Sequence, residues 1–84
     1  MFYKVKKIEP LDDCILYVTF ENNVKKYYDL KLIFDRWREF KILQNNKALF
    51  FNVKVDNGGY GVSWNEELDL SCNELWENGK EDIM

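Results

Sequence analysis

The chain has 84 residues, enough for one small hydrophobic core and too few for two domains. Apolar residues make up 46% of it and aromatic residues 17%, which excludes a disordered polar segment. The formal net charge is −3, but residues 1–65 carry eleven Lys/Arg against eight Asp/Glu, whereas residues 66–84 carry one lysine against seven acids. This distribution disfavours nonspecific binding to nucleic acid, which needs a concentrated positive face.

The chain contains no histidine, which removes Ser-His and Cys-His catalysis and imidazole metal sites together. Its two cysteines, Cys14 and Cys72, are too few and too far apart for a disulfide scaffold or a tetrahedral metal site. Cys14 falls in an apolar stretch and is expected to be a small buried side chain. We therefore expect a protein that is not an enzyme, without catalytic residues, cofactor or metal.

No apolar run approaches the roughly 18–20 residues that are needed to span a bilayer. The first residues, Met-Phe-Tyr-Lys-Val-Lys-Lys, also lack the apolar core and the small-residue cleavage site of a signal peptide. The sequence therefore predicts no membrane association and a cytoplasmic location.

The first half predicts a three-stranded antiparallel meander from Tyr3 to about Asp29. The clearest strand runs from Cys14 to Glu21, where the residues alternate between two faces. One face carries Cys14, Leu16, Val18 and Phe20. The other carries Ile15, Tyr17, Thr19 and Glu21. A turn signal at Pro10 precedes this strand, and Asn22-Asn23 reverses the chain after it, since Asn tolerates the positive φ of a hairpin turn.

Two short helical segments are predicted next. Asp29 is placed to cap a helix of about two turns. Its apolar face would consist of Leu30, Ile33, Phe34 and Trp37, which are spaced at i, i+3, i+4 and i+7. Asn45-Asn46 offers a second cap, for a short helical turn that ends at Phe50. Both segments should lie against the meander because their apolar residues need cover.

A second β-hairpin and a short C-terminal helix complete the predicted α+β domain. The hairpin turns at Asn57-Gly58-Gly59, and Tyr60, Val62 and Trp64 are expected on one face of its second strand. Ser71 at the N-cap and Glu74 three residues later match a capping box, and the helix should end near Gly79. The sequence thus predicts one domain over residues 1–79 and a frayed tail over residues 80–84.

Two groups of charged residues could support chemistry or binding. Glu66, Glu67 and Asp69 follow a strand end, where carboxylates can bind Mg²⁺ or Ca²⁺, but adjacent residues of an extended chain point apart and solvated loop acids are the preferred interpretation. The lysines of the first and third strands could instead meet on one face and contact phosphates. These lysines are Lys6, Lys7, Lys25 and Lys26. Lysine is also common on strand edges, where it prevents mispairing.

Aromatic residues provide the strongest functional signal in the sequence. Tyr17 and Tyr27 fall on the meander face opposite Phe20, so both faces of the sheet carry apolar side chains. The second face must be covered by another part of the chain or by a partner. We therefore take Tyr17, Tyr27, Trp37 and Trp76 as the candidate interaction surface, although core packing is the favoured interpretation for the tryptophans.

The chain resembles the bacterial domain-of-unknown-function family 2442 (DUF2442). The matching pieces, in chain order, are Val5-Lys6-Lys7-Ile8-Glu9-Pro10, Leu16-Tyr17-Val18-Thr19-Phe20, Tyr28-Asp29-Leu30, Val53-Lys54-Val55, Val62-Ser63-Trp64 and Leu68-Asp69-Leu70. One departure is Asn23, where such domains commonly have a hairpin glycine. The resemblance implies an α+β fold without established activity, often found beside another small domain in something like a toxin–antitoxin pair.

Together these observations predict a non-enzymatic protein-interaction module, antitoxin-like in a two-gene system, that binds another small protein or a second copy of itself. A nucleic-acid-binding accessory domain that uses the strand lysines is the second hypothesis, disfavoured by the lack of an arginine cluster or a reading motif. A metal-dependent enzyme based on carboxylates is the third.

Overall fold

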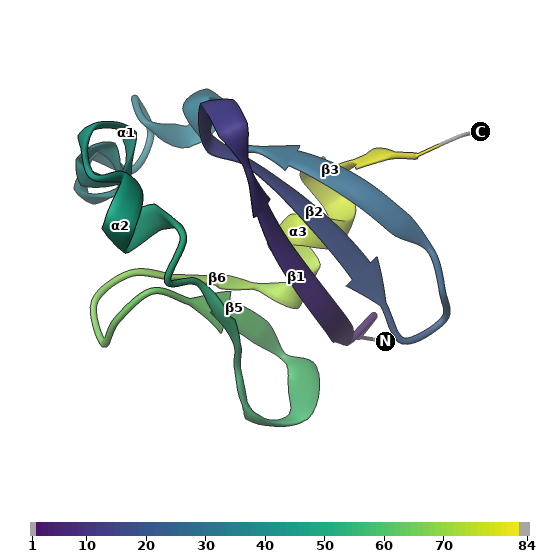
Figure 1. Cartoon of the computed structure of the whole chain (residues 1–84). Coiled ribbons are helices and arrows are strands. Elements are labelled where there is room, and N and C mark those ends of the chain that lie inside the picture. The colour runs from purple at the N-terminus through teal and green to yellow at the C-terminus, as the bar shows by residue number, and fades with distance from the viewer. Residues whose placement is uncertain (1, 83–84) are drawn as a thin grey trace.

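The computed structural model describes residues 2–82, and its first half forms the predicted meander (Figure 1). The strands are β1 (Val5–Leu11), β2 (Ile15–Phe20) and β3 (Lys25–Asp29), and β7 (Lys80–Glu81) joins the sheet beside β3. The sheet order is β1-β2-β3-β7 and all its pairings are antiparallel. The predicted α+β class is confirmed by this sheet, a second sheet and several short helices.

The sequence predicted the backbone conformation at one of the two turns of the meander but not at the other. Asn23 adopts a φ of 70° between β2 and β3, as expected for Asn in a tight reversal. Between β1 and β2 a short 3₁₀ helix, Asp12–Cys14, also carries positive φ values, 66° at Asp13 and 59° at Cys14. A cysteine rarely adopts this conformation, and nothing in the residue types indicated it.

The register of β2 separates the sheet into two faces. Leu16 lies opposite Tyr28 and points into the core, whereas Tyr17 lies opposite Tyr27 and points outward. We call the side with Tyr28 the inner face and the side with Tyr17 the outer face. The inner-facing residues of β2, which are Leu16, Val18 and Phe20, are fully buried.

The segment after β3 differs from the helix that the sequence predicted. Asp29 does cap it, by accepting a hydrogen bond from the backbone N–H of Lys31, but the helix is a single 3₁₀ turn, Leu30–Ile33. A hydrogen-bonded turn follows, in which the N–H of Trp37 donates to the carbonyl oxygen of Ile33 at 2.8 Å, but Trp37 itself leaves helical geometry (φ −129°, ψ 87°), so no continuous two-turn helix forms. A segment this short is not held by helix propensity. The buried Leu30 and Ile33 fix it against the core instead.

Three more one-turn helices lead to the second sheet. They are a 3₁₀ helix, Arg38–Lys41, and the α-helices α1 (Ile42–Asn45) and α2 (Lys47–Phe50). The side chain of Asn46 accepts a hydrogen bond from the backbone of Leu49 and caps α2, as predicted. Phe50 at the end of α2 is buried, so these turns close one end of the core.

The second hairpin is present, with shorter strands than the alternation suggested. It consists of β4 (Lys54–Val55) and β5 (Gly61–Ser63), and β6 (Asp69–Ser71) pairs with β5 on the other side. Tyr60 was expected on the same face as Val62 and Trp64, but it lies in the turn before β5 and is 51% exposed. The turn is a 3₁₀ helix, Asn57–Gly59, which starts the strand one residue later.

Helix α3 (Cys72–Asn78) covers the inner face of the first sheet (Figure 1). Ser71 caps it by accepting a hydrogen bond from the N–H of Glu74. Glu74 does not complete the capping box with its own side chain, which instead accepts hydrogen bonds from Tyr28 and Asn78. Leu75 is fully buried between α3 and the sheets.

The chain end differs from the predicted frayed tail. Lys80 and Glu81 pair with Tyr27 and Lys26 of β3, and the N–H of Asp82 donates to the carbonyl oxygen of Lys25. The remaining tail residues, 83 and 84, lie outside the described residues. This strand was not predicted, because a pairing of two residues produces no alternation of apolar and polar residues.

The approach of the second hairpin to β1 generates a stability prediction. Gly58 and Gly59 both have a φ of +80°, which costs an alanine about 1–2 kcal/mol. A Cβ at Gly59 would lie 2.6 Å from the backbone oxygen of Val5, whereas one at Gly58 would meet only the mobile ring of Tyr60. Gly59→Ala should therefore lower the free energy of unfolding by about 1–3 kcal/mol more than Gly58→Ala, as measured by urea denaturation. Equal urea midpoints for the two variants would show that β1 and the hairpin do not touch at this turn.

Candidate interaction surface

The outer face of the first sheet carries three rows of side chains that run across the strands. The register defines these rows. The first row is Leu11, Ile15 and Asp29; the second is Glu9, Tyr17, Tyr27 and Lys80; the third is Lys7, Thr19, Lys25 and Asp82. Helix α3 packs on the inner face, and the second sheet contacts β1 and α3. Within residues 2–82, therefore, no helix or further sheet covers the outer face.

Two tyrosines stand at the centre of the outer face. The rings of Tyr17 and Tyr27 lie 4.9 Å apart, tilted by 47°, and Tyr27 is 41% exposed. Directly opposite aromatic pairs stabilise neighbouring strands. They also present a rigid, amphipathic surface, which is what protein interfaces use as anchors.

Tyr17 is held in place by the chain end. Its hydroxyl donates a 2.8 Å hydrogen bond to the carboxylate of Asp82, reaching across β3. This hydrogen bond, with burial and the negative charge of Asp82, raises the pKa of Tyr17 to about 12. The phenol therefore stays neutral under physiological conditions, and β7 is attached to the outer face as well as to the edge of β3.

Trp76, another of the four candidate aromatics, does not belong to this face. Its ring stacks on Tyr3 at 3.8 Å and meets the edge of Phe20 at 4.9 Å, beneath the inner face. The ammonium group of Lys26 lies 4.0 Å from the ring centroid and donates to the carbonyl oxygen of Trp76. Trp76 is half-buried by these contacts, so it serves the core rather than an interface.

Trp37 lies in another part of the molecule. It is half-buried, packs against Phe40, and the guanidinium of Arg36 stacks on it at 4.4 Å. The structure therefore brings together Tyr17 and Tyr27 of the four predicted surface aromatics, and places Trp37 and Trp76 apart from them. Alternation along strands identified the pair, but it could not place two tryptophans outside strands.

The four candidate lysines are distributed over different surfaces. Lys7 and Lys25 lie on the outer face, where Lys7 forms a 3.0 Å ion pair with Glu9. Lys26 points to the inner face and contacts Trp76. Lys6 is the extra residue where the register between β1 and β2 shifts. No single positive face results, which argues against phosphate binding by this set.

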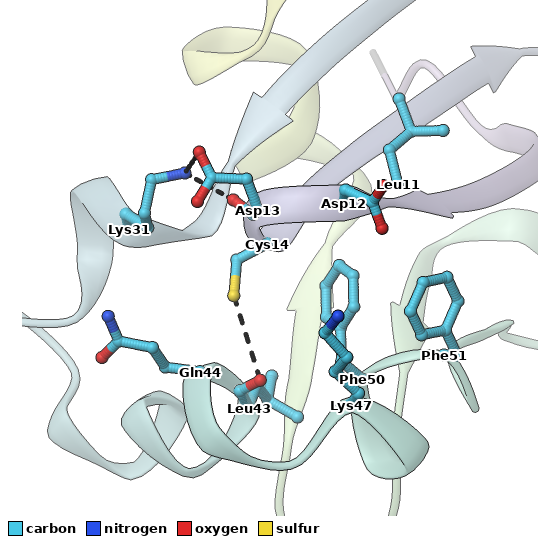
Figure 2. Close-up of a pocket in the computed structure, with 10 residues that line it drawn as sticks. All are labelled: Leu11, Asp12, Asp13, Cys14, Lys31, Leu43, Gln44, Lys47, Phe50 and Phe51. Carbon is cyan, nitrogen blue, oxygen red and sulfur yellow. Dashed lines mark hydrogen bonds and ion pairs between the residues drawn. The ribbon is translucent and has the colours of Figure 1, made fainter.

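A pocket of about 300 Å³ lies between the turn before β2 and helices α1 and α2 (Figure 2). Cys14 points into it, and its thiol lies 3.9 Å from the carbonyl oxygen of Leu43. Burial raises the pKa of Cys14 above its ordinary value, so the thiol is neutral and a poor nucleophile. Nearby Lys31 is engaged by Asp13 and Asp29, and these hydrogen bonds outweigh its burial and raise its pKa. The pocket thus shows no activated nucleophile.

A second, acidic pocket of about 230 Å³ lies between Trp37 and strand β6. Glu67 and Asp69 line it together with Glu39 and Glu74, whereas Glu66 is not among its lining residues. Within residues 2–82 no three carboxylate or thiol groups gather closely enough to hold a metal ion. Glu74 is also engaged by the hydroxyl of Tyr28, and burial, together with this hydrogen bond, raises the pKa of Tyr28 well above its ordinary value. The pocket is therefore an acidic surface groove.

Three comparisons place the chain among known proteins. A family model described as "Protein of unknown function (DUF2442)" matches residues 5–81, which confirms the resemblance read from the sequence. No curated protein and no solved structure matches the chain. No helix within residues 2–82 has the length and apolar character needed to cross a membrane.

The tie between Tyr17 and the chain end can be tested by removing one hydroxyl. In Tyr17→Phe the Asp82 carboxylate loses its donor, so β7 should open more often and the Asp82 amide should exchange faster with solvent. Tyr27→Phe is the matched control, because the Tyr27 hydroxyl makes no hydrogen bond to residues 2–82. Hydrogen exchange followed by NMR measures both variants, and equal protection of the Asp82 amide in them would contradict the tie.

The same hydrogen bond predicts a dependence of stability on pH. Since the pKa of Tyr17 is raised from 10.0 to about 12 in the folded protein, its contribution is fully present below pH 10, falls as pH rises from 10 to 12, and is lost above that range. The stability difference between the wild type and Tyr17→Phe should therefore shrink over this interval. Chemical denaturation at both ends of the interval measures it, and a difference that stays constant would refute the assignment.

Proposed function

The chain belongs to the DUF2442 family, and we propose that it is a small, non-enzymatic protein-interaction module whose outer sheet face docks on another protein. The observation that carries this proposal is the Tyr17–Tyr27 pair, at the centre of a sheet face that no helix or further sheet within residues 2–82 covers. A solvated face of an antiparallel sheet is normally polar. Paired aromatic rings at its centre are the composition of an interface core.

The surroundings of the two rings fit the same role. Lys7, Glu9 and Lys80 border them, so an apolar centre is surrounded by charged side chains. This is the arrangement of a protein interface, with a dry anchor and a solvated rim. The hydrogen bond from Tyr17 to Asp82 also fixes one ring before binding, which reduces the entropy that docking costs.

We extend the proposal to the cellular setting. An antitoxin-like component of a bacterial two-gene system, acting in the cytoplasm on a small partner, is the role that the family resemblance favours. The absence of histidine and the neutral Cys14 thiol support a binding role over catalysis.

The proposal predicts that a charge placed on the outer face removes partner binding. Tyr27→Glu should weaken association with the protein encoded by the adjacent gene roughly tenfold or more, because the new carboxylate would be desolvated at the interface centre. Co-expression, co-purification and titration by calorimetry measure the loss.

Tyr60→Glu is the matched control, since Tyr60 is also an exposed tyrosine, on the second hairpin. Each variant loses one aromatic contact, with Tyr17 or with Phe2, so both should keep the wild-type circular dichroism spectrum and show a similar, small lowering of the urea midpoint. If Tyr27→Glu binds as tightly as Tyr60→Glu, or if the adjacent protein binds neither variant nor the wild type and the wild type does not self-associate, the outer face is not a docking surface.

A further inference from the structure

Charge on the outer face is arranged so that one end complements the other. In the first row, Asp29 lies close to Asp13, and both carboxylates share the ammonium group of Lys31, at 2.9 and 3.1 Å. One cation between two acids leaves this end negative. Across the face, in the third row, Lys25 is exposed and forms no ion pair with any residue from 2 to 82.

This polarity matches that of a second copy turned by 180°. A two-fold axis that lies along the central row, parallel to the sheet and perpendicular to the strands, reverses the strand direction and keeps the strand order. It places Tyr17 over Tyr17, Tyr27 over Tyr27, and Lys25 of each copy over Asp29 of the other. It also places Glu9 over Glu9 and Lys80 over Lys80 at the two ends of the axis, where the oppositely charged Lys7 and Asp82 lie in the neighbouring row. An interface with two-fold symmetry needs such a self-complementary patch, because each contact then occurs twice.

The size of the face sets the expected strength. The width of the face follows from four strands spaced about 4.8 Å apart, and its length from a rise of about 3.3 Å per residue along each strand. Together they give a contact area of roughly 400 Å² per copy. A stable interface buries about 800 Å² per partner, so this contact is about half of that. The area therefore predicts a reversible association that appears at high protein concentration, with sheets packed face to face about 10 Å apart.

We infer that the outer face pairs two copies of this chain, with the Tyr17–Tyr27 row on the two-fold axis and Lys25 of each copy facing Asp29 of the other. This inference rests on the proposed function and names its partner as a second copy. It places the charged contacts at the rim and the four tyrosine rings in the dry centre.

Sedimentation equilibrium over a wide concentration range tests the inference. The wild type should show a monomer of 10.2 kDa in exchange with a dimer of twice that mass. Lys25→Glu should raise the dissociation constant roughly tenfold or more, because each new carboxylate would face Asp29 of the other copy. Lys54→Glu, an equal charge change on exposed β4, should leave the dissociation constant unchanged.

A second substitution keeps the test specific. Asp29→Asn removes the opposing charge and retains a side chain that caps a helix well, so the fold should survive. Added to Lys25→Glu, it should recover most of the lost association.

Each other outcome overturns the inference. A monomer at all concentrations shows that the occupant is not a second copy. A dimer that is insensitive to Lys25→Glu, or that Asp29→Asn fails to restore, shows that the copies meet elsewhere. In either case, loss of the neighbour-encoded protein from Tyr27→Glu but not from Tyr60→Glu would leave the proposed docking function standing, so the two failures are distinguishable.

Discussion

The packing of helix α3 on the inner face of the meander is the constraint on which the rest of the structure depends. Three contacts hold the helix there: Tyr28 donates to Glu74 at 2.8 Å, Trp76 stacks on Tyr3, and Lys26 reaches the last turn of the helix. The carbonyl ends of a helix attract a cation, so Lys26 stabilises α3 while its stem covers the indole. Because α3 takes the inner face, the outer face is left without a helix from this chain.

The same packing decides which residues are available for binding. The sequence offered Lys26 as a candidate phosphate contact and Trp76 as either a surface or a core residue. The structure places the two in contact with each other beneath the sheet. What remains outside is the row of Tyr17 and Tyr27 with the charged rows beside it. The availability of these two rings is thus a consequence of where the last helix packs.

The sequence predicted the features that depend on local rules. Alternation located β2 and its two faces, and the helix caps Asp29, Asn46 and Ser71 all accept their expected hydrogen bonds. The features it missed depend on tertiary contacts. The 3₁₀ helix after β3 ends at Ile33, and the chain leaves helical geometry at Trp37, which packs on Phe40. The positive φ of Cys14 is set by the turn between paired strands. Likewise, the alternation of residues along the strands predicted that Tyr17 and Tyr27 share a face. The hydrogen bond from Tyr17 to Asp82 joins residues 65 apart, and no local sequence pattern indicates it.

The edges of the first sheet explain why we propose a face, and not a strand edge, as the docking surface. A partner strand could add only to an edge with free backbone groups. The edge of β1 contacts the second hairpin, where Gly59 meets the backbone of Val5. The edge of β3 is paired with β7, a strand of only two residues. Because β7 is so short, its own free edge offers few backbone groups to an added strand. Binding by this sheet must therefore use side chains, and the tyrosine row is where the outer face presents them.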